Sequence, residues 1–550
     1  LYETRILEGK VISSSGKLKI SETNLLSLIK TIISLNESAL IHENLIRDFC
    51  GANYDGVLFN VARILNNILA KKATQKTNML MAEWGDLFSL AHNEQSQQSR
   101  IQTRKKILSA LLKTKFSDSE SESRALFALH TSYAIVLKLL AYRIISDIKF
   151  GAPLQNYKSL IAADSQALRS FCSDLEDGEI FRRLGILNLL EGDFFSWYCD
   201  KNQWNEDLAI ALQEILEILG RYEDVSKIFS RKNAMDLFKE LYEATVPQIV
   251  RATFGEFYTP FWLAQHVLEA ASPKEKWRVI DPCCGSGTFI IAAMVKIREE
   301  MREQPKEEIL KAALNRIAGV DLNPLAVLTT RVNFFIHIAD LLPEQLENLV
   351  IPIFLGDSSY VPEKIEVDGV KVLRYKLRTL MSPIEIELPI SLVSRGPEFV
   401  KLMYEYENLV KNEDLVKATE LVLNAVNKQD RTEYIEKGIL ELTKQLVNLE
   451  KKKWNGIWAR IITNFLTISC LGEFSCIIGN PPWIDWKNLP SGYREKIKSL
   501  CIDKGLFSGA GLTGGINLNV CALIAHVAIN NWLTKDGKLA FLMPKELAYQ

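Results

Sequence analysis

Apolar residues in the first 250 positions recur at three- and four-residue intervals, as they do on one face of an amphipathic helix. Residues 58–70, 125–145 and 208–219 show this spacing most clearly, and no repeat of fixed period accompanies it. The pattern predicts a mostly helical region over residues 1–234. The simplest interpretation of this region is a scaffold without chemistry of its own.

From residue 277 onward, short apolar runs alternate with helical patterns. The five strand candidates are residues 278–281, 318–322, 351–356, 476–479 and 538–543. Such alternation predicts an α/β fold with a parallel sheet covered by helices on both faces. In sheets of this kind, ligands bind at the carboxyl ends of the strands. We therefore expect residues 235–361 and 475–550 to form two parts of one sheet domain.

The two parts are separated by an insertion, residues 362–474. Its first part reads as irregular, whereas residues 398–453 have the Glu, Lys and Leu content of helices. This stretch ends in three consecutive lysines, Lys451, Lys452 and Lys453. A solvated helix end is the simpler interpretation of these lysines, and a DNA phosphate contact is the alternative.

Composition narrows the class of protein. A chain of 550 residues predicts two to four domains. The 66 basic and 67 acidic residues give a net charge of −1, so any nucleic-acid contact must rest on a local basic surface. Nine cysteines without a CxxC pair, and six histidines without HExxH, argue against a disulfide framework or a metal site and favour a reducing cytoplasm.

Neither a signal peptide nor a membrane span is expected, because the apolar runs are broken well short of about 18 residues. The chain begins with Leu1 and ends at Gln550 soon after a strand candidate, so we expect it to be part of a longer protein.

The segment VIDPCCGSGTFIIAA, residues 279–293, is typical of a strand, a glycine turn and a helix start. Gly285 and Gly287 allow close approach of the backbone to a ligand, and the helix start offers unpaired N–H groups. Asp281 at the end of the strand would repel a pyrophosphate and attract a cationic ligand. The pattern therefore favours S-adenosylmethionine over NAD, with a purely structural turn as the alternative.

Two further acids follow strand candidates. Asp321, in AGVDLNPLA, is placed to accept hydrogen bonds from both ribose hydroxyls of an adenosine. Asp357, in FLGDSSY, is placed to accept from an exocyclic adenine amino group. Each acid alone could equally cap a helix. Three acids in strand order favour a ligand site.

Upstream of the sheet, the segment FGEFYTPFWLA contains Thr259 and Pro260, which we expect to be a helix N-cap and the first helical residue. Glu256 and Tyr258 precede them and could close over the ligand. The alternative is a helix cap with a hydrophobic contact and no ligand.

The segment SCIIGNPPWIDW delivers Asn480, Pro481, Pro482 and Trp483 to the end of a strand. Two acceptors, the Asn480 carboxamide and the rigid Pro481 carbonyl, would bind the hydrogens of an amino group on a planar ring and free its lone pair for methylation. Trp483 would stack on that ring after base flipping, which is worth about 1–3 kcal/mol. We expect Trp486 to be packing.

The motifs GEFYTP, DPCCGSGTF, GVDLNP, GDSS and NPPW occur in this order over about residues 235–550. With them the chain resembles the amino-group DNA methyltransferases, and more closely the N6-adenine enzymes of the large single-chain restriction-modification and phage-defence type. The resemblance implies a Rossmann-like S-adenosylmethionine-dependent methyltransferase sheet, preceded by an all-α domain and interrupted by a helical insertion.

The resemblance also implies a role for each motif residue. The residues implied to bind the methionine end of the cofactor are Glu256, Tyr258, Thr259, Asp281, Cys283, Gly285 and Gly287. The ribose falls to Asp321 and Leu322, the cofactor adenine to Asp357 and Ser358, and the target base to Asn480, Pro481, Pro482 and Trp483, with Asn480 also bordering the cofactor.

The implied activity is methylation of N6 of a flipped adenine in double-stranded DNA, with recognition, nuclease or other defence subunits as possible partners. N4-cytosine methylation, protein glutamine methylation and a non-catalytic cofactor-binding subunit are the alternatives. The family commonly has an acid two residues after a Phe in the last strand before NPPW, where this chain has Cys476 after Phe474. An early match to a nuclease motif, Glu8-Gly9-Lys10, has no companion acid, so we do not predict a fused nuclease.

Overall fold

The computed structural model describes fifteen segments of the chain, and all structural statements below refer to these. They are residues 4–7, 10–14, 40–89, 98–116, 118–147, 157–191, 194–222, 237–248, 251, 259–271, 277–452, 457–489, 491–503, 505–506 and 519–543.

A five-stranded sheet, all parallel, lies at the centre of the second half of the chain, in the order β10-β9-β3-β4-β5. Its strands are β3 (Val279–Asp281), β4 (Ile317–Asp321), β5 (Ile353–Leu355), β9 (Phe474–Gly479) and β10 (Leu533–Phe541). All five predicted strands are confirmed, and so is the α/β fold class. Because every strand runs the same way, the carboxyl ends of all five strands lie at the same end of the sheet.

Helices cover both faces of this sheet. Their bounds are α13 Phe261–Ala271, α14 Thr288–Glu300, α15 Lys306–Arg316, α16 Pro324–Ile338, α21 Trp458–Thr467, α22 Ser491–Asp503 and α23 Val520–Trp532. Successive side chains along each strand point to opposite faces of the sheet. Val279 and Ile317 pack in a large core with α14 and α16, whereas Ile280 and Ala318 pack in a smaller core with α22 and α23.

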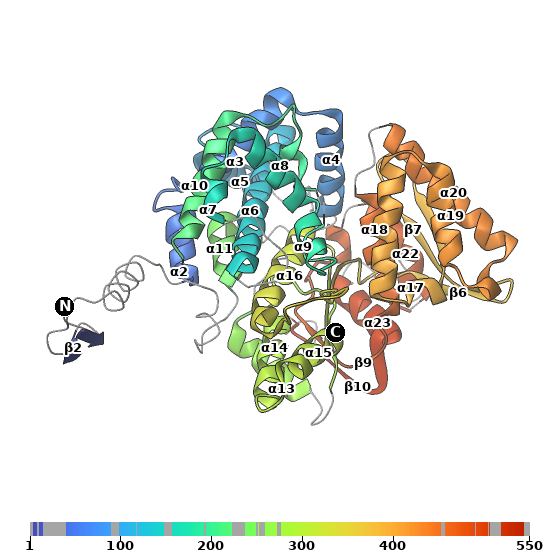
Figure 1. Ribbon diagram of the computed structural model, residues 1–550. Coiled ribbons are helices and arrows are strands. Elements are labelled where there is room, and N and C mark those ends of the chain that lie inside the picture. Colours follow the sequence, from blue (N-terminus) through green and yellow to red (C-terminus); the bar gives the residue numbers. More distant parts are fainter. Residues whose placement is uncertain are drawn as a thin grey trace.

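The first half of the chain is helical, as predicted, and lies beside the sheet region (Figure 1). Its helices are α2 His42–Leu45, α3 Val57–Lys72, α4 Gln75–Ser89, α5 Gln98–Leu112, α6 Ser119–Asp147, α7 Tyr157–Ile161, α8 Ser165–Glu176, α9 Glu179–Arg183, α10 Glu206–Gly220 and α11 Leu237–Thr245. The three predicted periodic stretches lie within α3, α6 and α10. A short antiparallel pair, β1 (Thr4–Leu7) and β2 (Lys10–Ser14), was not predicted.

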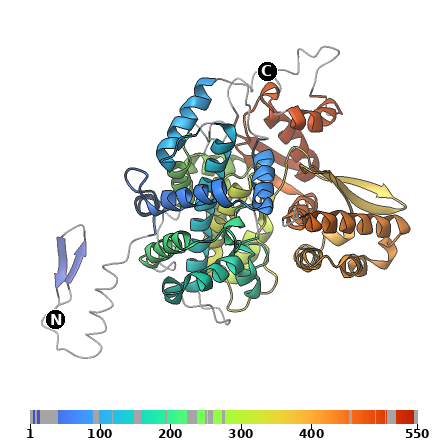
Figure 2. The ribbon, with the colours of Figure 1, turned by 90° about the horizontal axis from the view of Figure 1, so that it is seen from above.

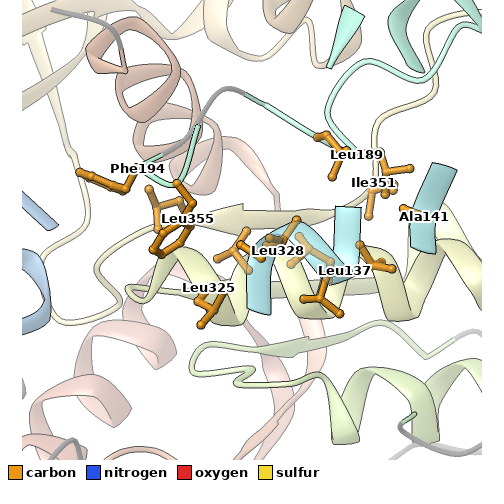
Figure 3. Packing of buried hydrophobic residues seen from close by; sticks show 14 of the residues in the cluster. Leu137, Ala141, Leu189, Phe194, Leu325, Leu328, Ile351 and Leu355 are labelled. Atoms are coloured by element: carbon orange, nitrogen blue, oxygen red, sulfur yellow. The ribbon is translucent and has the colours of Figure 1, made fainter. Parts of the chain in front are cut away.

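The helical region shares its core with the sheet region. Leu137 of α6 lies near Leu328 of α16, and Ala141 of α6 lies near Ile351 (Figure 3); all four belong to the same buried cluster. Burial of apolar area between these helices stabilises their contact at roughly 25 cal/mol per Å². The helical region therefore forms an outer layer on one face of the sheet.

Backbone pairing also joins the helical region to the edge of the sheet. Leu187 N–H donates to the Leu349 carbonyl at 2.8 Å, and Leu349 N–H donates to the Gly185 carbonyl at 2.7 Å. The buried Asn188 side chain exchanges two hydrogen bonds with the Ile351 backbone, at 2.7 and 2.9 Å. These bonds cover polar groups that an edge strand would otherwise leave exposed.

A network of charged and polar side chains also connects the helical region to β5. Arg331 of α16 pairs with Glu191 of the helical region at 2.5 Å and with the Asn464 oxygen of α21 at 2.8 Å. Its Nε donates to the Ile353 carbonyl at 2.9 Å, and Asn464 accepts from Leu355 N–H at 3.2 Å. Arg331 is 4% exposed while Glu191 is only partly buried, and the further hydrogen bonds of Arg331 make the burial of its charge tolerable.

The insertion begins with a three-stranded antiparallel sheet, so the prediction of an irregular first part was wrong. Its elements are β6 Glu363–Val367, β7 Val370–Leu377, β8 Ile384–Pro389, α17 Ile390–Val393, α18 Pro397–Lys411, α19 Leu415–Ala425 and α20 Glu433–Lys451. Asp368 and Gly369 form a two-residue turn with φ of 51° and 77° between alternating apolar residues, which is a strong hairpin signal. The insertion projects to one side of the molecule (Figure 2).

The helices predicted within residues 398–453 are confirmed as α18 to α20. Lys451 and Lys452 are exposed at the end of α20, which fits the solvated interpretation, and Lys453 lies outside the described residues.

One described helix, Ser119–Ser146 within α6, is long and apolar enough to cross a membrane. We did not predict it, because charged residues interrupt the apolar runs of the sequence. Its most apolar window is 100% buried inside the folded chain, as the central helix of a packed domain is.

We expect Asn188→Ala to destabilise the protein by about 1–3 kcal/mol, because the buried Ile351 N–H would lose its acceptor and the Ile351 carbonyl would keep only the Ile353 N–H as a donor. Urea unfolding measures the change. The matched control is Asn202→Ala, at an exposed residue of the same region, with an expected change within about 0.5 kcal/mol. Equal stability of the two variants would contradict the stabilising role of Asn188 at the contact between the helical region and the sheet.

Candidate functional site

An open cavity lies at the carboxyl ends of β3, β4, β5 and β9, with an empty space of about 1440 Å³ that includes solvent at its mouth. Its lining combines buried polar groups with apolar side chains, as small-molecule sites do. The predicted site residues among those lining it are Thr259, Asp281, Cys283, Gly285, Asp321, Leu322, Asp357, Ser358, Asn480 and Pro482.

The glycine turn after β3 has the backbone conformation that its sequence requires. Gly285 and Gly287 have φ of 54° and 96°, which side-chain-bearing residues rarely adopt. A Cβ on Gly287 would lie 2.9 Å from Thr330, so this glycine also permits close packing on α16. Thr330 Oγ1 donates to the Gly285 carbonyl at 2.6 Å, and Asn333 donates to the Ser286 carbonyl at 2.9 Å. Two hydrogen bonds from α16 thus fix the backbone of the turn.

Asp281 is 1% exposed, and its two oxygens differ. Oδ1 accepts the Cys283 N–H at 3.0 Å, while Oδ2 has no hydrogen-bond partner among the described residues. Burial, and to a smaller extent the nearby charge of Asp321, raise the pKa of Asp281 to about 8. A buried carboxylate in this condition suits a positively charged ligand.

Gly479 allows β9 to end beside Asp281. A Cβ at this position would lie 2.6 Å from Asp281 Oδ1, closer than van der Waals contact permits. The glycine before NPPW is therefore required by the approach of the two strand ends.

Asp321 is held by the glycine turn. Its Oδ2 accepts Gly285 N–H at 2.8 Å and its Oδ1 accepts Asn323 N–H at 2.8 Å. Burial raises the pKa of Asp321, and the backbone N–H groups oppose that shift. These bonds orient the carboxylate at the rim of the cavity, where a ribose could reach it.

Asp357, 3% exposed, follows β5. Ser359 donates to its Oδ1 through both its N–H, at 3.0 Å, and its hydroxyl, at 2.6 Å. Ser358 Oγ donates to the Pro282 carbonyl at 2.5 Å, which joins this loop to the loop after β3.

Asn480 comes directly after β9, and its Nδ2 donates to Thr259 Oγ1 at 3.3 Å. This donation fixes the carboxamide, so that its oxygen is directed away from Thr259. Trp483 donates its indole N–H to the Leu542 carbonyl at 3.2 Å, which holds the ring beside the end of β10.

The cap predicted for α13 was wrong. The Pro260 carbonyl accepts the first helical hydrogen bonds, from Leu263 and Ala264, and the helix begins at Phe261. The Thr259 hydroxyl instead accepts a hydrogen bond from Asn480, which directly follows β9.

Several predicted residues lie elsewhere. Gly287, Pro481 and Trp483 do not line the cavity, although each adjoins residues that do. Glu256 and Tyr258 lie outside the described residues, as do Glu8 and Gly9 of the nuclease motif. Trp486 packs against the smaller core, as predicted.

Sequence reasoning missed Tyr242 and Tyr493, which line the cavity from α11 and α22. Tyr493 is followed at helical spacing by buried Ile497 and Cys501, a pattern that signals only a core-facing stripe. No group of three or more potential metal ligands is present in the described part of the chain.

Two family models match the chain. The one described as N-6 DNA Methylase matches residues 233–358, and the one described as Eco57I restriction-modification methylase matches residues 315–549. Together they contain every strand of the five-stranded sheet and every residue that lines the cavity.

Among curated relatives, the adenine-specific methyltransferase PglX of Streptomyces coelicolor is 31% identical over 112 residues, which are 18% of this chain and 9% of that protein. The methylase subunit of the type I restriction enzyme EcoEI of Escherichia coli is 27% identical over 122 residues, 22% of this chain and 24% of that subunit. The chain thus spans less than a quarter of either relative.

A solved structure, the ATP-dependent type ISP restriction-modification enzyme LlaBIII bound to DNA, aligns with 88% of this chain and 24% of its own, at 14% identity and a TM-score of 0.35.

The raised pKa of Asp281 predicts pH-dependent binding of S-adenosylhomocysteine, which carries an ammonium group. Below about pH 8 the carboxyl is protonated in the empty site, and a cation favours its ionised form. Between about pH 6 and about pH 8, affinity should therefore rise with pH by up to about tenfold per unit, with release of a proton on binding.

Isothermal titration in two buffers of different ionisation enthalpy measures both quantities. In the control Asp281→Asn, affinity should be weaker and independent of pH over this range. A pH-independent affinity in the parent would contradict the assignment of a cation to Asp281.

Proposed function

We propose that the chain, which matches the N-6 DNA Methylase and Eco57I restriction-modification methylase models, transfers a methyl group from S-adenosylmethionine to the N6 amino group of adenine in double-stranded DNA. The observation that carries this proposal is the convergence of Asp281, Asp321 and Asn480 on one cavity. Asp281 and Asp321 suit a cationic nucleoside, while Asn480 suits an amino group.

The residues of the cavity fit the proposed cofactor. Among the described residues, Oδ2 of buried Asp281 has no hydrogen-bond partner and suits the cationic methionine end, and no described atom lies within 4 Å of the Cβ position of Gly285. Asp321 would accept from the ribose hydroxyls, and Asp357 from the adenine amino group. When bound, S-adenosylmethionine supplies an electrophilic methyl group on a sulfonium.

Asn480 and Pro481 would act on the target base. An exocyclic amino nitrogen is a poor nucleophile, because its lone pair is delocalised into the ring. The Asn480 oxygen and the Pro481 carbonyl would accept hydrogen bonds from both amino hydrogens and so favour a tetrahedral nitrogen. Thr259 fixes the carboxamide for this task, because it accepts from Nδ2. The acidic proton left after transfer needs no strong base, so solvent can take it.

Trp483 would stack on the flipped base. Its indole N–H is fixed on the Leu542 carbonyl, which limits rotation of the ring before the base arrives. Partners that choose the DNA site or cleave it, such as recognition or nuclease subunits, belong to the same proposal. A DNA substrate places the protein in the cytoplasm, in keeping with its nine free cysteines.

We expect Asn480→Ala to reduce N6-adenine methylation by at least about 100-fold, while cofactor affinity stays within about threefold of the parent. Expression in methylation-deficient bacteria, followed by mass spectrometry of DNA nucleosides, measures methylation. The control is Asn412→Ala, at an exposed residue of the insertion. Detection of N4-methylcytosine in place of N6-methyladenine would overturn the choice of base, and cofactor binding without DNA methylation would favour a non-catalytic subunit.

We expect Asp321→Ala to weaken binding of S-adenosylmethionine by about 1–3 kcal/mol, because the ribose hydroxyls lose their acceptor. Isothermal titration compares it with Asp536→Ala, at an exposed acid of β10 outside the cavity. Equal affinity of these two variants would refute the ribose role.

A further inference from the structure

Tyr493, which the motifs do not include, contacts the acid at one end of the cavity. Its hydroxyl lies 3.1 Å from Asp357 Oδ1 and 3.4 Å from Oδ2. The side chain is 5% exposed and comes from α22, whereas Asp357 follows β5, so the contact joins residues 136 positions apart. Ser359 contacts the hydroxyl of Tyr493 and also Asp357 Oδ1. The three side chains form one buried hydrogen-bonded group.

The phenol acts as a donor in this group. Burial and the negative charge of Asp357 raise the pKa of Tyr493 well above its usual value, so the hydroxyl keeps its proton. Hydrogen bonds to a carboxylate are stronger than those between neutral groups. Tyr493 therefore restrains the rotation of the Asp357 carboxylate, in addition to the two donors of Ser359.

The position of α22 in the chain gives this contact a second consequence. The helix follows the NPPW segment. Its buried residues Tyr493, Ile497 and Cys501 belong to the smaller core, between the sheet and the helices α22 and α23. One hydroxyl thus links the helix after the target-base segment to the end of β5. Apolar side chains line the same cavity, namely Ile484, Leu489, Val520 and Ile524.

We infer that Tyr493 is a positioning residue, which orients the Asp357 carboxylate so that the cavity selects a purine bearing an exocyclic amino group. This inference rests on the proposed function, because it assigns Asp357 to the cofactor adenine. Tyr493 acts through Asp357, and the apolar side chains of the cavity bind the ring whether or not it carries the amino group. Loss of the phenol hydroxyl therefore reduces selectivity for the amino group more than affinity for the ring.

A ligand pair separates these two quantities. Isothermal titration is performed with S-adenosylhomocysteine and with its 6-deamino analogue, in which hydrogen replaces the amino group. We expect the parent to prefer the adenine ligand by about 10- to 100-fold, as a hydrogen bond to a charged acceptor predicts. In Tyr493→Phe this preference falls below about threefold, while affinity for the deamino analogue stays within about threefold of the parent. The two ligands and two proteins form a double-mutant cycle.

Tyr406→Phe is the matched control, because Tyr406 is also buried and its hydroxyl donates to Thr443 in the insertion, at 3.1 Å. It should leave the preference unchanged. If Tyr493→Phe does not fold, Ser359→Ala removes the other hydroxyl donor to Asp357 and should lower the preference in the same direction.

The outcomes distinguish the inference from the function on which it rests. If the parent binds neither ligand, the proposed cofactor site itself fails. If the parent binds the adenine ligand selectively and Tyr493→Phe keeps the whole preference, only the role of Tyr493 is refuted. Equal weakening of both ligands in Tyr493→Phe would show a purely structural tyrosine and would also overturn the inference.

Discussion

The site depends on a carboxylate that is buried without full compensation. Asp281 lies where β3 and β9 end side by side, and Gly479 lets the second strand pass within van der Waals reach of its oxygen. One oxygen has a backbone donor and the other has none among the described residues. Desolvation of a charge is costly, so the empty site favours the protonated acid. A cationic ligand would reverse that preference, which makes this buried acid the electrostatic centre of the cavity.

Other contacts fix the geometry around this acid. Thr330 and Asn333 of α16 hold the carbonyls of the glycine turn, and the turn in turn donates to Asp321. The loop that would bind the methionine end and the acid that would bind the ribose are therefore one hydrogen-bonded unit. Preorganisation of this kind lowers the entropy lost when a ligand binds.

The helical first half is more than a separate scaffold. It shares a buried cluster with α16, pairs its backbone with the edge of the sheet, and contributes Tyr242 to the cavity wall. Its Glu191 also pairs with Arg331, which holds the backbone of β5 just before Asp357. The position of the helical region is thus mechanically connected to the proposed adenine site, through contacts that the periodicity of its helices could not indicate.

Local sequence determined the helices, the parallel strands and the acids at their ends, because hydrophobic period, glycine turns and the alternation of strands with helices can be read from short segments. The hairpin of the insertion was within reach of the same reasoning, since Asp368-Gly369 lies between alternating apolar residues. Tertiary structure alone decided that Thr259 contacts Asn480, that Tyr493 contacts Asp357, and that the pKa of Asp281 is raised. These contacts join segments more than a hundred residues apart, and the degree of burial that shifts a pKa exists only after those segments have packed together.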